Sequence, residues 1–132
     1  MSDSDGASVA TAGHLDPYCP YFAAAMGVVG KRWAGEVLRA LIPDPLRFGA
    51  LASAIPGLTE STLSLRLKEL EAAELVGRVV HSERPVRVEY RLTAKGRALG
   101  AVLLDLNSWA LEWMTPVTAP PAVTATSPVP PT

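Results

Sequence analysis

The side chains best suited to binding chemistry lie between Thr59 and Glu74, where apolar residues recur with the period of a helix. Leu63, Leu67 and Leu70 form one stripe that must be buried against a core. The remaining surface carries small hydroxyl groups, a lysine and one leucine, at Ser61, Thr62, Ser64, Leu65 and Lys68. Hydroxyl and ammonium groups can hydrogen-bond outward. The stretch therefore predicts a helix with one face for packing and one for a partner.

The start of this helix is strongly marked in the sequence. Thr59 suits an N-cap, and Leu58 and Leu63 occupy the N′ and N4 positions of a hydrophobic staple. Glu60, at the first helical position, suits the positive end of the helix dipole. A fixed start of this kind favours a helix that presents its first turn to a partner.

Catalytic chemistry is not indicated. No nucleophile, base and orienting acid come together in the sequence, and it contains no glycine-rich phosphate loop. The single cysteine, Cys19, excludes an intrachain disulfide, and His14 and His81 lack metal-ligand spacing. We therefore expect no enzyme, no cofactor and no metal site.

The net charge of −1 would by itself argue against a nucleic-acid partner, but the charges are unevenly distributed. Between residues 78 and 97, six basic residues stand against two acidic ones. The basic residues are Arg78, Arg84, Arg87, Arg91, Lys95 and Arg97. Such a segment is either a solvated charged hairpin or a surface for nucleic acid.

A chain of 132 residues predicts a single domain, which we place at residues 17–114. Residues 1–16 have few large apolar side chains and residues 115–132 are rich in proline, so a disordered arm and a disordered tail are expected. No apolar run approaches the roughly 20 residues that span a bilayer. The acidic first residues do not resemble a signal peptide. These features predict a soluble, cytoplasmic protein.

Proline and glycine positions predict the elements before the binding helix. A first helix should begin at Pro20. A second, over residues 30–42, has Trp33 as its largest core candidate. A third spans residues 46–55, and a Pro-Gly break then joins it to the binding helix in the arrangement of a helix-turn-helix. On this segment alone, DNA binding and a helical hairpin that binds nothing fit equally well.

After the binding helix the period changes to two residues, as in β-strands. Residues 76–81 and 87–92 predict a β-hairpin with a basic tip. Arg78 can pair with Glu89 across this hairpin, although the sequence does not fix the register.

The longest helix should run from Ala94 to Met114, with Thr93 as its N-cap. One apolar stripe contains Leu99, Val102, Leu103, Leu106, Ala110 and Trp113. Leu104 and Leu111 lie on another face. One apolar face can pack on the helix's own domain, and the other is most simply buried against the same helix of a second subunit. We therefore expect a homodimer interface that includes Leu104, Trp109, Leu111 and Trp113.

The order of three helices, a binding helix, a β-hairpin and a long helix is that of a winged helix-turn-helix, a mainly α fold with a small β-hairpin. Several strings in this order resemble HxlR-type transcriptional regulators, relatives of the MarR group. They are Cys19-Pro20, Gly30-Lys31-Arg32-Trp33, Leu46-Arg47-Phe48, Leu65-Arg66-Leu67-Lys68-Glu69-Leu70-Glu71, and Arg87-Val88-Glu89-Tyr90 followed by Leu92-Thr93 and Gly96. Each string is weak alone, but their order and spacing from about Cys19 to Trp113 are specific.

The resemblance implies a homodimer, joined by helices at both ends of the domain, that binds a near-palindromic DNA operator. Residues 59–74 would enter the major groove, and a basic wing over residues 78–91 would contact flanking DNA. By position, the DNA-binding residues would be Ser61, Thr62, Ser64, Leu65, Arg66 and Lys68 on the helix, with Arg84 and Arg87 on the wing. Arg66 lies near the core edge of the helix, so a phosphate contact is favoured for it over base reading. The alternative is a winged-helix module that binds only other proteins.

Three residues bear on specificity and regulation. Leu65 stands where such regulators usually have a polar residue, and it either contacts a thymine methyl group or is a partly shielded surface leucine. Glu60 either turns aside from DNA or accepts from a cytosine amino group. Some relatives sense oxidants or electrophiles through a cysteine at the position of Cys19, where a helix N-terminus favours the thiolate. The resemblance thus raises a small-molecule or oxidant effector, against the alternative of an unreactive, partly buried cysteine.

Overall fold

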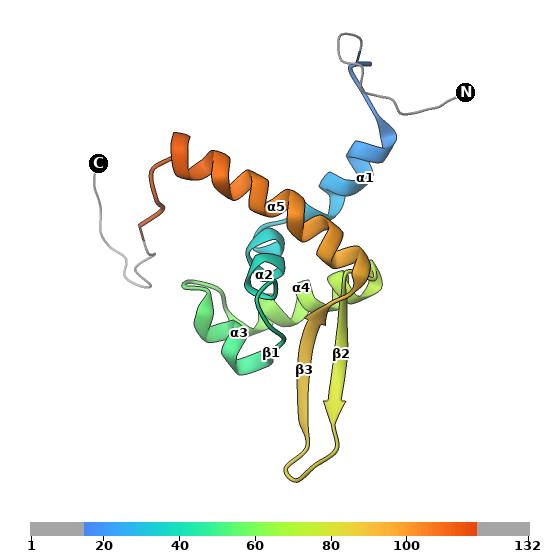
Figure 1. The fold of residues 1–132 in the computed structure, drawn as a ribbon, viewed down its shortest axis with the longest axis vertical. Helices are drawn as coiled ribbons and strands as arrows, with labels where there is room; N and C mark the ends of the chain where they lie inside the picture. Colours follow the sequence, from blue (N-terminus) through green and yellow to red (C-terminus); the bar gives the residue numbers. More distant parts are fainter. Residues whose placement is uncertain (1–14, 119–132) are drawn as a thin grey trace.

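The computed structural model describes residues 15–118, and its elements follow the order expected for a winged helix-turn-helix (Figure 1). The helices in this range are α1 (Pro20–Val29), α2 (Ala34–Ala40), α3 (Phe48–Ala54), α4 (Glu60–Ala72) and α5 (Ala94–Trp113). The strands are β1 (Leu46–Arg47), β2 (Val76–His81) and β3 (Arg87–Leu92). Most of the predicted arm (1–16) and tail (115–132) lies outside the described residues, so the limits of the domain stay a prediction.

Helix α4 is the binding helix that the sequence predicts. Its N-cap is Thr59, whose Oγ1 accepts a hydrogen bond from the Thr62 backbone N–H at 3.2 Å. Leu58 and Leu63 are both buried, as a hydrophobic staple requires. The predicted N-cap is therefore confirmed, and the first turn of α4 is held in place.

The hydrophobic core lies between α2, α3, α4 and the sheet. Leu63, Leu67 and Leu70 of α4 expose 1% of their surface or less. The same cluster contains Val37, Leu38, Leu51 and Leu92. The predicted leucine stripe is the face that α4 buries, so its opposite face is available to a partner.

The sheet has three antiparallel strands in the order β1-β3-β2, and the two-residue strand β1 was not predicted. In the hairpin, Arg78 lies opposite Tyr90, and Glu89 lies opposite Val79. The pairing of Arg78 with Glu89 therefore does not form. Glu89 instead contacts His81, with 2.9 Å between Oε1 and Nε2.

The helix predicted over residues 30–42 begins later than expected. Trp33 has a left-handed backbone, with φ at 77°, and is the N-cap of α2. The preceding residues form a turn in which the Arg32 guanidinium lies 4.8 Å from the centroid of the Trp33 ring. Trp33 packs against the core but remains half-buried. The prediction that Trp33 is helical is therefore wrong, and its role in the core is partial.

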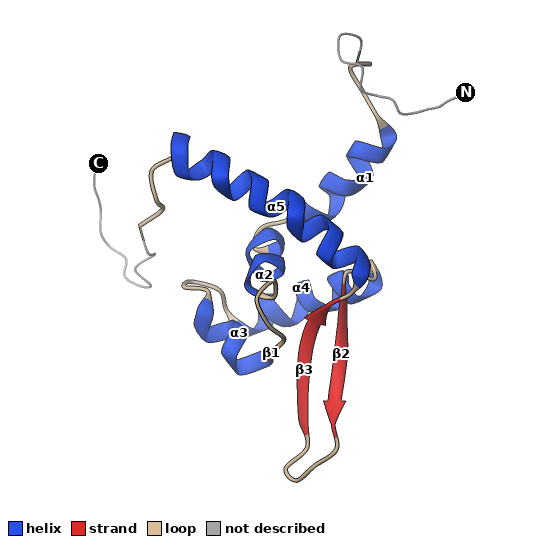
Figure 2. Cartoon of the chain, viewed as in Figure 1, coloured by secondary structure: helices blue, strands red, loops and turns tan. Residues whose placement is uncertain are grey.

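Helices α1 and α5 extend from the body at the end opposite the hairpin (Figure 2). Helix α1 begins at Pro20, as predicted, and none of its residues is buried. In α5, Leu99 and Leu103 pack against the core. Three other members of the predicted stripe are exposed by 60%, 57% and 68%, namely Val102, Leu106 and Trp113. The prediction that the whole stripe packs on the domain is wrong for these three residues, because the face of α5 that does so runs through Gly100, Leu103 and Asn107, to one side of them.

The start of α5 holds the end of α4. The predicted N-cap Thr93 is confirmed, since its Oγ1 accepts from the Gly96 N–H at 3.0 Å. The same hydroxyl donates to the Glu74 carbonyl oxygen at 2.7 Å, and Lys95 Nζ donates to the Ala73 carbonyl oxygen at 2.7 Å. These bonds satisfy carbonyl groups that follow α4. The binding helix is thus held at both ends.

Candidate nucleic-acid interface

The exposed side of α4 carries most of the helix residues predicted to contact DNA. Ser61, Ser64 and Lys68 are exposed, and Leu65 exposes 50% of its surface. Thr62 is half-buried, and its hydroxyl oxygen accepts from Thr59 Oγ1 at 3.0 Å. We call Ser61, Ser64, Leu65 and Lys68 the reading face. Thr62 lies at its edge, within the network that caps the helix.

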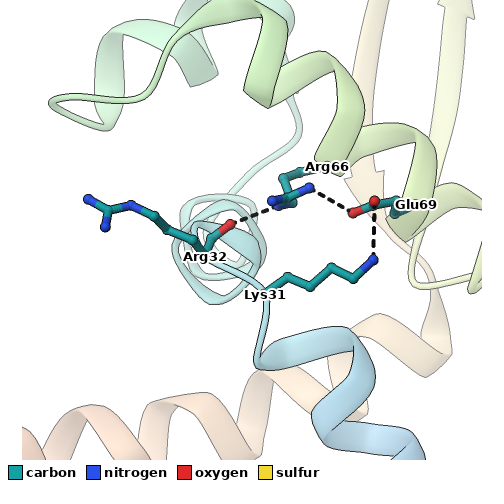
Figure 3. Close-up of polar contacts among 4 residues, drawn as sticks. All are labelled: Lys31, Arg32, Arg66 and Glu69. Atoms are coloured by element: carbon teal, nitrogen blue, oxygen red, sulfur yellow. Dashed lines mark hydrogen bonds and ion pairs between the residues drawn. The ribbon is translucent and has the colours of Figure 1, made fainter.

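Arg66 has a different environment from the other predicted helix residues. Its side chain is only 16% exposed. Arg66 Nε donates to the Arg32 carbonyl oxygen at 2.8 Å, and Nη1 donates to Glu69 Oε1 at 3.1 Å (Figure 3). Lys31 Nζ lies 3.3 Å from the other carboxylate oxygen of Glu69. Because these partners lie 34 and 38 residues apart in the sequence, no local pattern could have revealed this cluster.

The β2–β3 hairpin carries the predicted wing residues. Arg84 is exposed at the tip. The Arg87 side chain is 37% exposed, and its Nη2 lies 3.3 Å from Glu83 Oε1. Val80 and Val86 are also exposed, by 60% and 63%. The tip therefore combines the positive charge of Arg84, a partly neutralised arginine and apolar side chains.

Cys19 lies at the N-terminal end of α1, as predicted. It is exposed and is the N-cap residue, with Sγ accepting a hydrogen bond from the Phe22 N–H at 3.5 Å. The alternative of a partly buried cysteine is wrong for this chain in isolation. A thiol in this position is accessible to solvent and experiences the positive end of the helix dipole.

The outer parts of α1 and α5 carry exposed apolar side chains, on more than one face of α5, and together we call them the apolar end. It comprises Tyr21, Phe22, Met26, Val102, Leu104, Leu106, Trp109, Leu111 and Trp113. The four residues predicted for a dimer interface, Leu104, Trp109, Leu111 and Trp113, are exposed by 43%, 52%, 81% and 68%. Large exposed apolar patches normally mark interaction surfaces.

Other kinds of site are not supported within residues 15–118. There, no three His, Cys, Asp or Glu side chains are placed to hold a metal ion. None of the helices in this range combines the length and apolar character needed to cross a bilayer.

Comparison with known proteins decides the family. A family described as HxlR-like helix-turn-helix matches residues 28–118. The chain belongs to the HxlR family. Its relative YodB from Bacillus subtilis (strain 168), an HTH-type transcriptional regulator, is 42% identical over 98 residues, which cover 74% of this chain and 88% of YodB. The family resemblance is therefore confirmed, and this HxlR-family chain is a transcriptional regulator and not an enzyme.

Solved structures confirm the winged helix-turn-helix fold. The reduced form of YodB from B. subtilis matches with a TM-score of 0.66 and 42% identity, over 73% of this chain and 94% of that one. Quinone-bound YodB matches with a TM-score of 0.62 and 38% identity, over 73% of this chain and 100% of that one. The redox regulator HypR in its oxidised form matches with a TM-score of 0.67 and 34% identity. The match covers 71% of this chain and 96% of that one. DNA is the partner that transcriptional regulation implies for this HxlR-family protein.

Proposed function

We propose that this HxlR-family regulator is a homodimer that binds a near-palindromic operator, with α4 of each subunit in the major groove. The observation that carries the proposal is the division of α4 into two faces. Its leucine stripe is buried, while the reading face points outward on a helix held at both ends. A rigid helix with a polar outer face suits direct contact with base edges.

The reading face supports a division of labour among its residues. The Ser61 and Ser64 hydroxyls can donate to or accept from bases, and Lys68 can contact phosphate. Leu65 is half-exposed among these polar groups, which suits contact with a thymine methyl group and a preference for an A·T pair. Glu60 is exposed at the start of the helix and would either turn aside or accept from a cytosine amino group.

The apolar end supports the homodimer. Its exposed tryptophans and leucines come from α5, and α1 adds Tyr21, Phe22 and Met26; both helices lie on the side of the molecule away from the hairpin (Figure 1). Pairing two copies there would bury these side chains and leave both reading faces open to DNA. A two-fold dimer of this kind reads two half-sites related by the same symmetry.

The hairpin supports a second contact with DNA. Arg84 is exposed at its tip and would bind a phosphate of the flanking backbone. Arg87 should contribute less, since Glu83 already neutralises part of its charge. The wing would therefore add affinity more than sequence preference.

Selection of bound fragments from random DNA by the full-length protein tests the proposal. We expect an enriched, near-palindromic sequence whose affinity falls steeply with salt, with a log–log slope of about −0.9 per neutralised phosphate. The rival, a winged helix that binds only proteins, predicts no enrichment and no salt-dependent retention of DNA. That result would refute the proposed function.

Variants separate the roles of the wing and the reading face. Arg84→Ala should weaken binding to selected and random DNA alike and reduce the salt slope by about 0.9 per subunit, or about 1.8 for the dimer. Leu65→Gln and Ser61→Ala should instead change preference among sequences by about 1–3 kcal/mol per good contact. An altered preference in Arg84→Ala with an unchanged salt slope would show that the division of roles is wrong.

The dimer is tested with Leu111→Glu, because this side chain is 81% exposed and contributes little to the fold of one chain. Sedimentation should show that the variant is monomeric while its circular dichroism is unchanged. A dimer of wild-type stability would place the interface elsewhere.

A second candidate activity, control of DNA binding by oxidants or electrophiles, is favoured by the exposed thiol of Cys19 at the start of α1. Relatives solved in quinone-bound and oxidised forms support it. Diamide or a quinone should weaken binding of wild-type protein to the selected fragment. Equal weakening in Cys19→Ser would exclude a role for this residue.

A further inference from the structure

The cluster of Lys31, Arg32, Arg66 and Glu69 joins the binding helix to the segment that follows α1 (Figure 3). Arg66 donates both to a backbone carbonyl of that segment and to a carboxylate on its own helix. The carboxylate also contacts the Lys31 ammonium, so the charges of Lys31, Arg66 and Glu69 all face opposite charges, whereas Arg32 contributes only its carbonyl group. A guanidinium held by two partners in fixed directions is oriented much more strictly than one in a single surface pair.

Apart from this cluster, few contacts join α1 to the C-terminal half of α4. A partly open groove of about 350 Å³ lies there, lined by residues that include Gly27, Lys31, Glu69 and Ala73. None of the α1 side chains is fully buried, and only Val28 and Val29, at its C-terminal end, pack partly against the core. Lys31 comes directly after Gly30, the C-cap of α1. The polar cluster is thus a main connection between the end of α1 and α4.

We propose that Arg66 is a positioning residue, which sets the orientation of α4 relative to α1, and is not a phosphate contact. To reach a phosphate, the guanidinium would have to give up its bonds to the Arg32 carbonyl and Glu69 and leave a site where the Arg66 side chain is only 16% exposed. Lys68, two residues further along, is exposed on the reading face and needs no such rearrangement. The inference rests on the proposed function of α4 as the DNA-reading helix.

The two roles of Arg66 predict opposite results for Glu69→Gln. If Arg66 bound phosphate, removing the competing carboxylate would free the arginine and reduce negative charge near DNA, so affinity would rise. If Arg66 positions α4, losing the carboxylate loosens the helix. Affinity for the selected fragment should then fall by about two- to thirtyfold, the range seen for residues that act through an intermediate element.

Substitutions of Arg66 give a second, independent comparison. Lysine retains the positive charge but cannot form two bonds in the fixed fork of a guanidinium. Positioning therefore predicts that Arg66→Lys loses affinity for the selected fragment nearly as much as Arg66→Gln, with wild-type salt slopes in both. A phosphate contact predicts near wild-type binding for Arg66→Lys and a slope reduced by about 0.9 per subunit, or about 1.8 for the dimer, for Arg66→Gln. Lys68→Gln is the matched control, in which that reduction of the slope is expected.

Hydrogen exchange measured without DNA keeps the test independent of the operator. Amides of residues 60–72 should exchange faster in Glu69→Gln and Arg66→Lys than in wild-type protein, and Lys68→Gln should leave them unchanged. Glu69→Gln and Lys31→Gln alter partly exposed groups, so they remain informative if an Arg66 variant does not fold. Tighter DNA binding by Glu69→Gln, or unchanged exchange in α4, would overturn the proposal. If wild-type protein selects no DNA, the proposed function fails, and the exchange data still decide whether Arg66 positions α4.

Discussion

Gly96 is the point where α5 approaches the turn after α4 most closely, and replacing it tests how the binding helix is fixed. A Cβ at this position would lie 2.1 Å from the Leu75 carbonyl oxygen and 3.3 Å from Leu92 Cβ. The oxygen is not free to move, since it accepts a hydrogen bond from the Thr93 N–H at 3.0 Å. Because a carbon and an oxygen atom need about 3 Å or more, α5 would have to shift by about 1 Å.

This shift sets the expected magnitude for Gly96→Ala. Loss of the Thr93 N–H bond would leave the carbonyl of buried Leu75 unsatisfied, at a cost of about 1–3 kcal/mol. Weakening of the adjacent Thr93 and Lys95 bonds to the end of α4 would add about 1 kcal/mol. The better helix propensity of alanine would return about 1 kcal/mol. The net loss is about 2 kcal/mol, which lowers the melting temperature of a domain of this size by about 8 °C or more.

Thermal unfolding followed by circular dichroism, at one fixed protein concentration, measures this loss. Gly49→Ala is the matched control, because an added Cβ at this helical position has no atom within 4 Å. It should leave stability unchanged or raise it by up to about 1 kcal/mol. A melting temperature within about 2 °C of wild type for Gly96→Ala would refute the reasoning, since the contact would then not constrain α5.

Three further comparisons test the fold around α4. Leu63→Ala should lower the free energy of unfolding, measured in urea, by about 2–5 kcal/mol. Leu65→Ala, on the exposed face, should change it by no more than about 0.5 kcal/mol. Similar losses in the two variants would mean that the faces of α4 are misassigned. Thr59→Ala should lower the free energy of unfolding by about 1 kcal/mol and Thr59→Ser by much less. Equal stability of Thr59→Ala and the wild type would show that the N-cap bond is dispensable. Arg39 Nε donates to Asn107 Oδ1 at 2.6 Å, so alanine at either position should cost at most about 1 kcal/mol, and the double variant should cost no more than one of them. Full additivity would mean that the two side chains do not interact.

Features encoded by neighbouring residues could be predicted from the sequence. The leucine period and Thr59 were sufficient to predict α4, because an amphipathic stripe and a cap are local patterns. The strands of the hairpin were recognised from their two-residue period. Their register was not, since it depends on the loop that joins them and on contacts such as His81 with Glu89.

Features that depend on distant segments could not be predicted. Strand β1 has two residues, too few for any period, and exists because it pairs with β3. Trp33 fits a helical pattern, yet its backbone turns at the start of α2. A helical wheel also does not tell how much of an apolar stripe the rest of the domain covers, so it could not show that Trp113 is exposed in one chain. At the candidate site, the exposure of Ser61 and Lys68 was predictable from the wheel, but the partners of Arg66 were not.

The attachments of α4 explain why its orientation should depend on the apolar end. Its C-terminal end is held by the first turn of α5, through Thr93 and Lys95. Its middle is held by the turn after α1, through Arg66. Both attachments lead to helices whose outer parts form the proposed dimer interface. A change in how two copies pack would therefore act on α4 from two directions, and would alter the spacing of the two reading faces without altering any residue that contacts DNA.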